Sequence, residues 1–187
     1  MDWILASASP RRKELLQQLI PTFEIIPATA EEQVTGNPTP AELVVMLAKQ
    51  KALEIAQTTQ AEGKAVLGAD TVVAVDGEVL GKPKDEQDAV RMLTRLSGRT
   101  HEVYTGVCIV YTDKEGVKIV TDFARTEVLF YALTQRQILD YVKTGSPMDK
   151  AGAYGIQDGN LVERIEGSFS NVVGLPLELC KKMIESV

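Results

Sequence analysis

Histidine is almost absent from this sequence, because His101 is the only one among 187 residues. A Ser-His-Asp triad or a histidine-ligated metal centre would have to depend on that one side chain. His101 lies in the strand-like run THEVYTGV, where an ordinary structural role is favoured over catalysis. The shortage therefore argues against serine-hydrolase chemistry and against a histidine-rich metal site.

Cysteine is scarce too, and two well-known nucleotide-binding loops are missing. Cys108 and Cys180 stand in unrelated contexts with no C-x-x-C pair, which favours two buried thiols in a reducing cytoplasm over a disulfide or a zinc site. The sequence has no G-x-x-x-x-G-K-[ST] loop and no G-x-G-x-x-G after a strand. P-loop NTPases and dinucleotide-binding proteins therefore lack their fingerprints here.

Basic residues are outnumbered, and long apolar runs do not occur. Twenty Lys and Arg stand against 26 Asp and Glu, for a net charge of -6. General nucleic-acid binding needs a basic face, so no nucleic-acid partner is expected. No apolar run approaches the roughly 18 residues of a membrane span, and no signal peptide is recognisable. We therefore expect a cytoplasmic protein without a membrane partner.

The pattern of apolar residues predicts alternating strands and helices. Strand-like runs occupy residues 3–7, 23–26, 65–69, 72–75, 78–80, 101–112, 117–133 and 161–165. Helix-like runs, several with capping residues, occupy 10–19, 39–58, 85–96, 134–145 and 176–186. The segment SPMDKAGAYGIQDGN shows no regular period. This order predicts a single α/β domain over residues 1–187 with a mixed sheet.

The stretch SASPRRKELL predicts a helix with an unusual first turn, because that turn carries three cations. Ser9 is a good N-cap and Pro10 suits the first helical position. Arg11, Arg12 and Lys13 then crowd the first turn, where the unpaired N–H groups are already positive. An anion bound there would explain them. Without it, replacing Arg11 or Arg12 by Ala should be neutral or slightly stabilising.

Carboxylates at probable strand ends and loops are the sharpest chemical candidates. Asp70 directly follows the apolar run AVLGA, and ligands of open α/β sheets bind beyond the carboxyl ends of strands. The alternative is that Asp70 satisfies the N–H groups of a turn. Glu31 and Glu32 lie in the loop after the second strand. Carboxylates from separate loops could hold Mg²⁺, although a solvated charge pair is the simpler interpretation.

Two lysines could complete such a site. Lys51 lies on the capped helix in LAKQKALEIA, and Lys82 lies in GKPKD, held extended by the following proline. Each alone is more often a solvated surface residue. Several cations beside two carboxylates would instead suit a polyphosphate with a bound metal ion.

Six segments together resemble the Maf family. They are LASASPRRKELL, LGADTVV, GKPKD, LSGRTHEVYTGV, GSPMDKAGAYGIQ and GSFSNVVGLPLE, in the family's order and over most of the chain. The resemblance implies a two-lobed α/β fold, with an elongated mixed β-sheet flanked by helices, similar to the inosine triphosphate pyrophosphatase (Maf/Ham1-like) fold. It also implies a nucleoside triphosphate pyrophosphatase that uses a divalent metal cation, Mg²⁺ or Mn²⁺. A house-cleaning role, a link to septum formation and a homodimer are further expectations of the resemblance.

The family's site residues are carried over by motif. Asp70 in GADT matches the proton acceptor, and Glu32 in EEQ matches a second acidic position that helps hold metal or water, with Glu31 as the other candidate. The positions expected to bind phosphate are Ser7, Ser9, Arg12, Lys51 and Lys82.

Three further positions separate the family's branches. They are Arg11, Thr71 and Gln157, and all three resemble the dTTP/UTP branch rather than the branch that acts on methylated GTP. Gln157 can both donate and accept, which suits the O4 and N3–H edge of a pyrimidine. The alternatives are a nucleotide-sensing division regulator with incidental hydrolysis and a 7-methyl-GTP pyrophosphatase.

Overall fold

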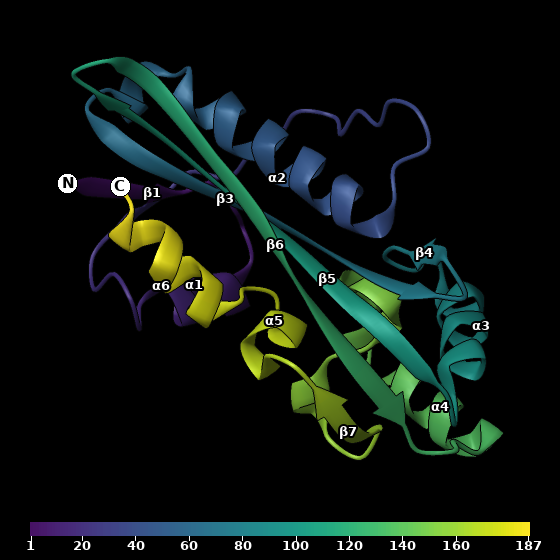
Figure 1. Ribbon diagram of the computed structural model, residues 1–187. Helices are drawn as coiled ribbons and strands as arrows, with labels where there is room; N and C mark the ends of the chain where they lie inside the picture. Colours follow the sequence, from purple (N-terminus) through teal and green to yellow (C-terminus); the bar gives the residue numbers. More distant parts are fainter.

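A long, mixed, seven-stranded sheet runs through the whole protein (Figure 1). The structure is a computed structural model that describes residues 1–187. The strand order is β2-β1-β3-β5-β6-β7, with β4 paired to β3. The strands are β1 Asp2–Leu5, β2 Glu24–Ile25, β3 Lys64–Val75, β4 Glu78–Leu80, β5 Thr100–Asp113, β6 Gly116–Phe130 and β7 Val162–Glu166. Only β1 pairs in parallel, with β2 and β3. The mixed α/β architecture expected from the sequence is confirmed.

Six α-helices and four short 3-10 segments connect the strands. The α-helices are α1 Pro10–Leu16, α2 Pro40–Ala56, α3 Glu86–Leu96, α4 Gln135–Lys143, α5 Phe169–Val173 and α6 Leu177–Glu185. The 3-10 segments are η1 Thr59–Ala61, η2 Ser146–Asp149, η3 Ala151–Ala153 and η4 Ile156–Asp158. Complete capping boxes begin α2, at Thr39 and Glu42, and α4, at Thr134 and Gln137. These local signals explain why both helices begin where the sequence predicted.

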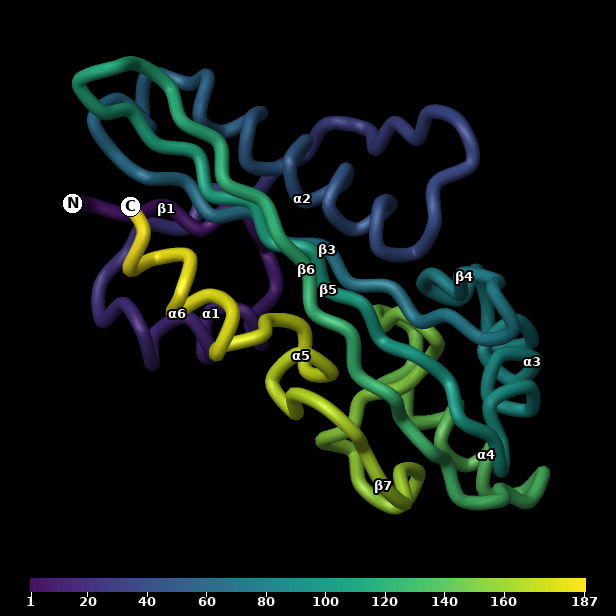
Figure 2. Tube along the Cα trace, viewed as in Figure 1, coloured from purple at the N-terminus to yellow at the C-terminus, as the bar shows by residue number.

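Separate apolar cores divide the molecule into two lobes (Figure 1). In the first lobe, α1 and α6 cover one face of the sheet, and Leu16 and Cys180 pack there against Leu67 of β3. The opposite face is covered by α2. The second lobe forms around α3, α4 and the far ends of β3, β5 and β6. Both chain ends lie in the first lobe, where Trp3 and Val187 pack into the same cluster (Figure 2).

Asp70 lies inside strand β3, and not at the end of a strand as the sequence suggested. The sequence predicted a strand over 65–69 and a hairpin strand over 72–75, with Asp70 between them. One continuous strand spans Lys64–Val75, and Asp70 lies in its middle, opposite Gly106 of β5. The polar pair Asp70-Thr71 resembles a strand end, but here it marks the point where β3 passes from one lobe to the other.

Two helices also differ from prediction, one in its end and one in its existence. The helix expected over 10–19 ends at Leu16, and the N–H groups of Gln18 and Leu19 bond three residues back rather than four, so the chain tightens into a 3-10 turn. Helix α5 was missed because its five residues are too few to show a helical period.

The lone histidine and both cysteines are structural. His101 is buried, shares a 2.7 Å hydrogen bond with the Tyr154 hydroxyl and packs edge-on against Phe130. Burial lowers the pKa of His101 to about 4, so the ring is neutral near pH 7. Cys108 and Cys180 are free and buried, and burial raises the pKa of each thiol to about 12.

None of the helices combines the length and apolar character that crossing a bilayer requires.

Two glycines allow α2 to lie directly on the sheet. A Cβ at Gly106 would lie 2.2 Å from the Val44 carbonyl oxygen, and one at Gly68 would lie 2.5 Å from that of Ala48. Both obstacles are backbone atoms of α2, which cannot rotate away. The absence of a side chain at these two positions therefore sets the distance between the helix and the sheet.

We predict that Gly106→Ala lowers the free energy of unfolding by about 1–3 kcal/mol, because the added methyl must push α2 outward. Gly81→Ala is the matched control. Its Cβ would meet no atom within 4 Å, so it should be neutral or stabilising by about 0.4–1 kcal/mol. Urea denaturation measures both, and equal stability of the two variants would contradict the close packing.

Candidate active site

A cleft of about 560 Å³ lies between the lobes. Of the ten site residues predicted from the sequence, it is lined by Ser9, Arg11, Arg12, Glu32, Lys51, Asp70, Thr71, Lys82 and Gln157. Ser7 lies just behind them and is only 8% exposed. Residues far apart in the chain are thus brought to one site.

An ion pair between helix α2 and strand β3 lies in the middle of the cleft. Lys51 Nζ is 2.5 Å from Asp70 Oδ1 and 2.8 Å from Glu32 Oε1. Burial raises the pKa of the Asp70 carboxyl above its ordinary value, and the positive charges of Lys51 and Arg12 only partly offset that rise. A buried carboxylate with a raised pKa is the kind of group that acts as a general base near neutral pH.

The loop that carries Glu32 is fastened to α2. Glu54 accepts hydrogen bonds from the N–H groups of Thr29 and Ala30 at 2.8 and 3.1 Å, and Gln50 accepts one from the Gln33 N–H at 3.0 Å. Between these anchors, Glu32 rather than Glu31 lines the cleft. Sequence reasoning missed these anchors, because nothing in the local pattern showed that the loop folds back on the helix.

Arg12 ties three segments together. Its Nε donates to the Gly174 carbonyl at 2.8 Å, and its Nη2 donates to the Thr71 hydroxyl at 3.1 Å. Nη1 donates to Ser7 Oγ at 3.4 Å. Removal would leave buried acceptors unpaired, which costs stability. These hydrogen bonds favour a destabilising Arg12→Ala, the opposite of the neutral or stabilising effect that the sequence suggested.

The hydroxyls beside Arg12 have local partners. Ser9 Oγ caps α1 by accepting the Arg12 N–H at 3.3 Å, and Ser7 Oγ accepts the Ser9 N–H at 3.2 Å. Thr71 Oγ1 also lies 2.8 Å from Thr105 Oγ1. Thr71 thus orients the Arg12 guanidinium, a physical role that its position in the sequence did not suggest.

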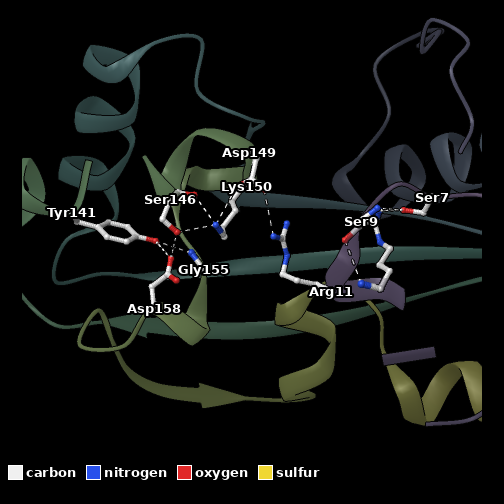
Figure 3. Close-up of polar contacts among 10 residues, drawn as sticks. Ser7, Ser9, Arg11, Tyr141, Ser146, Asp149, Lys150, Gly155 and Asp158 are labelled. Carbon is white, nitrogen blue, oxygen red and sulfur yellow. Dashed lines mark hydrogen bonds and ion pairs between the residues drawn. The ribbon is translucent and has the colours of Figure 1, made fainter. Parts of the chain in front are cut away.

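Arg11 reaches across the cleft to the second lobe (Figure 3). Its Nη1 lies 3.6 Å from Asp149 Oδ2. Lys150, the next residue, donates to the Ser146 carbonyl at 2.6 Å and to the Asp149 carboxylate at 3.1 Å. This chain of contacts is the polar link between α1 and the segment that follows α4.

A second set of hydrogen bonds holds the irregular segment that carries Gln157 (Figure 3). Asp158 Oδ2 accepts from the hydroxyls of Tyr141 at 2.5 Å and Ser146 at 2.7 Å. The Gly155 N–H donates to the Tyr141 hydroxyl at 3.0 Å. Side-chain contacts therefore join η2 and η4, the 3-10 segments at the two ends of residues 146–158, to each other and to α4.

Two polar residues of the cleft have no partner within the chain. Lys82 follows β4, Gln157 lies in η4, and both line the cleft. Neither side chain makes a hydrogen bond or ion pair to another residue of the chain, so both are free to contact a ligand.

The carboxylates of the cleft fit a divalent cation only with help from a ligand. No group of three His, Cys, Asp or Glu residues is close enough to enclose a metal ion. The carboxylates of Asp70 and Glu32 both contact Lys51 Nζ, so they lie in the same part of the cleft. Two carboxylates suit Mg²⁺, which usually keeps water and takes its remaining ligands from substrate phosphates.

Comparisons with known proteins agree with this geometry. The family model described as Maf-like protein matches residues 2–187. The dTTP/UTP pyrophosphatase of Thermococcus gammatolerans is 50% identical over 184 residues, which cover 97% of this chain and 95% of that protein. The corresponding protein of Clostridium perfringens is 47% identical over 189 residues, covering 100% and 97%.

A solved structure of a HAM1 protein from Coxiella burnetii resembles the fold, with a TM-score of 0.54 at 17% identity over 100% of both chains. The Ham1 protein of Staphylococcus aureus gives a TM-score of 0.50 at 16% identity, covering 100% of this chain and 99% of that one. At such low identity these likenesses concern the fold alone. By the family match and by its near-half identity to those relatives, the chain belongs to the Maf family.

Proposed function

We propose that this chain hydrolyses dTTP and UTP to the nucleoside monophosphate and pyrophosphate. The observation that carries the proposal is the buried Asp70 carboxylate in the middle of the cleft, beside Lys51 and close to Arg12. A general base can activate a water molecule for attack on a polyphosphate, and the cations around it can stabilise the negative charge of the phosphates. The relatives described above carry the same activity in their names.

Asp70 acts as the base in the proposed reaction. It accepts a proton from water, whose oxygen bonds to the α-phosphorus while the bond from that phosphorus to the bridging oxygen breaks. The electron pair leaves with pyrophosphate. Lys51 keeps Asp70 ionised until the proton moves, because its positive charge opposes the rise in pKa that burial causes.

The cations of the cleft stabilise the charge of the triphosphate. Lys51 and Lys82 face the cleft from α2 and from the loop after β4. Arg12 is fixed before substrate arrives by its bonds to Gly174 and Thr71, so little reorganisation is needed. A divalent metal, Mg²⁺ or Mn²⁺, would be held by Asp70 and Glu32 and would neutralise phosphate charge.

The second lobe selects the base. Gln157 offers one donor and one acceptor without an internal partner, which matches the O4 and N3–H edge of a pyrimidine. Arg11 lines the same cleft and is held there by Asp149. Thr71 acts through Arg12, so it affects the placing of phosphate more directly than the choice of base.

Two alternatives are less well supported. A nucleotide sensor would not need a buried carboxylate with a raised pKa. A 7-methyl-GTP pyrophosphatase would be expected to carry Glu where this chain has Gln157. The cytoplasmic location, the house-cleaning role and the link to septum formation stay predictions from the resemblance.

We predict that Asp70→Asn lowers kcat by a factor on the order of 10²–10⁴ while the fold is retained, because the amide cannot accept the proton. Asp140→Asn, an exposed change on α4, is the control and should keep full activity. Colorimetric pyrophosphate release and circular dichroism measure the two properties. Near-normal turnover by Asp70→Asn would rule out Asp70 as the base.

The same assay in ¹⁸O-labelled water tests the bond that breaks. Attack on the α-phosphorus places the label in the monophosphate. Label in pyrophosphate, or release of single orthophosphate, would contradict the proposed reaction.

Gln157→Glu is expected to lower kcat/KM for dTTP and UTP by roughly 10- to 100-fold, because a carboxylate cannot donate to O4. Gln18→Glu adds the same charge at an exposed position outside the cleft and should change little. A panel of pyrimidine and purine triphosphates measures the effect. Unchanged relative rates across the panel would remove Gln157 from base selection.

A further inference from the structure

Strand β5 carries a buried hydroxyl in an otherwise apolar row of side chains. Alternate residues of a strand face the same side of the sheet, so Val103, Thr105 and Val107 form one row, and all three are buried. Valine has a methyl group where threonine has its hydroxyl, so an apolar side chain would fill the same space. A buried hydroxyl costs free energy unless it is hydrogen-bonded. The partners of Thr105 therefore show what this residue contributes.

The Thr105 hydroxyl makes two hydrogen bonds, and together they fix the direction of two protons. Thr105 Oγ1 lies 3.2 Å from the Asn171 carbonyl oxygen, which can only accept, so Thr105 is the donor in that bond. A hydroxyl has a single proton to donate. In the 2.8 Å contact between Thr71 Oγ1 and Thr105 Oγ1, the donor is therefore Thr71 and the acceptor is Thr105.

The Thr71 hydroxyl then presents its lone pairs to Arg12. Arg12 Nη2 donates to Thr71 Oγ1 at 3.1 Å, and a guanidinium has no acceptor atom. The Gly174 carbonyl is a second acceptor for the Thr71 proton, but it lies 3.5 Å away and already accepts from Arg12 Nε at 2.8 Å. The Thr105 hydroxyl thus keeps the Thr71 proton out of the contact with the guanidinium.

These bonds close a circuit that begins and ends at the buried residue Asn171. One branch runs from Arg12 through Thr71 and Thr105 to the Asn171 carbonyl. In the other branch, Arg12 Nε donates to the Gly174 carbonyl, and the Gly174 N–H donates to the Asn171 carbonyl at 3.0 Å. Asn171 is fully buried, and its side-chain amide donates to the backbone of β5 at 3.0 Å. The circuit is therefore anchored to the sheet.

We propose that Thr105 is a positioning residue for Arg12 and acts on it through Thr71. Its hydroxyl accepts the Thr71 proton and passes the chain of hydrogen bonds on to α5, so the guanidinium is held in one orientation. Hydrogen bonds that all point the same way strengthen one another in a buried environment. Arg12 and Thr71 line the cleft, whereas Thr105 lies behind them, so Thr105 acts without touching the substrate.

The kinetic consequence rests on the proposed function, in which Arg12 binds phosphate. A guanidinium that is fixed in advance loses little freedom when a ligand binds. Without the Thr105 hydroxyl, binding has to supply that order, and the cost is the same for the bound substrate and for the transition state. Such a loss raises KM and leaves kcat nearly unchanged. A partly unfolded variant behaves differently, because fewer active molecules lower the apparent kcat at unchanged KM.

Three variants separate this role from ordinary packing. Thr105→Val removes the hydroxyl and keeps the shape of the side chain, whereas Thr105→Ser keeps the hydroxyl. Thr126→Val is the matched control, because Thr126 is equally buried on the neighbouring strand β6. Its hydroxyl contacts the Ser168 carbonyl at 3.1 Å and the Asn171 amide at 3.0 Å, and it makes no hydrogen bond to Arg12. Both valine variants therefore lose one buried hydroxyl.

The Nε–H group of Arg12 can be followed by ¹⁵N NMR in the ligand-free protein. Its hydrogen exchange is slow while the guanidinium is fixed. We expect Thr105→Val to accelerate this exchange by roughly tenfold or more, and Thr105→Ser and Thr126→Val to leave it within about twofold of the unaltered protein. Unchanged exchange in Thr105→Val, or equal acceleration in Thr126→Val, would overturn the proposal.

Steady-state hydrolysis of dTTP gives the second test. Thr105→Val should raise KM by roughly three- to tenfold with kcat within about twofold, and Thr105→Ser should retain the original KM. In a Thr71→Val background, Thr105→Val should add little, because both residues act in one chain. Fully additive effects, or a lower kcat at unchanged KM, would refute the positioning role.

The two tests also separate this proposal from the proposed function. If the unaltered protein releases no pyrophosphate from dTTP, the proposed function fails. The exchange of the Arg12 Nε–H group in the ligand-free protein then still decides whether Thr105 positions the guanidinium.

Discussion

The contact between Lys51 and Asp70 is the constraint on which the candidate site depends. It joins helix α2 to the middle of β3 at 2.5 Å, and it requires α2 to lie directly on the sheet. Gly68 and Gly106 allow that approach, and Gly106 is the register partner of Asp70. A packing feature of the core thus sets the position of the charged pair in the cleft.

Burial of Asp70 has a cost that the surrounding charges reduce. A carboxyl whose folded-state pKa lies above its unfolded value binds its proton more tightly when folded, so its ionised form at neutral pH opposes folding. Lys51 and Arg12 offset part of that cost. Arg12 also connects α1, β3 and the turn after α5. Groups that stabilise the ionised base therefore also hold the first lobe together.

Much of the site could be predicted from the sequence, because local signals place its residues. Capping boxes located α2 and α4 correctly, and the motifs identified nine residues that line one cleft. The position of Asp70 within β3 could not be predicted, because a polar pair inside a strand resembles its end. The contacts of Tyr141, Lys150 and Asp158 were missed for another reason. They hold a segment without a period, so no pattern showed which side chains meet.

The ionisation of Asp70 tests the account most directly. Carboxyl-¹³C NMR, in the absence of divalent metal, can follow this side chain in the unaltered protein and in Lys51→Met. The account predicts a pKa above the ordinary value of about 3.9 for Asp, and a further rise in Lys51→Met because the stabilising charge is gone. Protonation would then begin at a higher pH as the pH falls. A pKa at or below the ordinary value, or one that Lys51→Met leaves unmoved, would contradict the account.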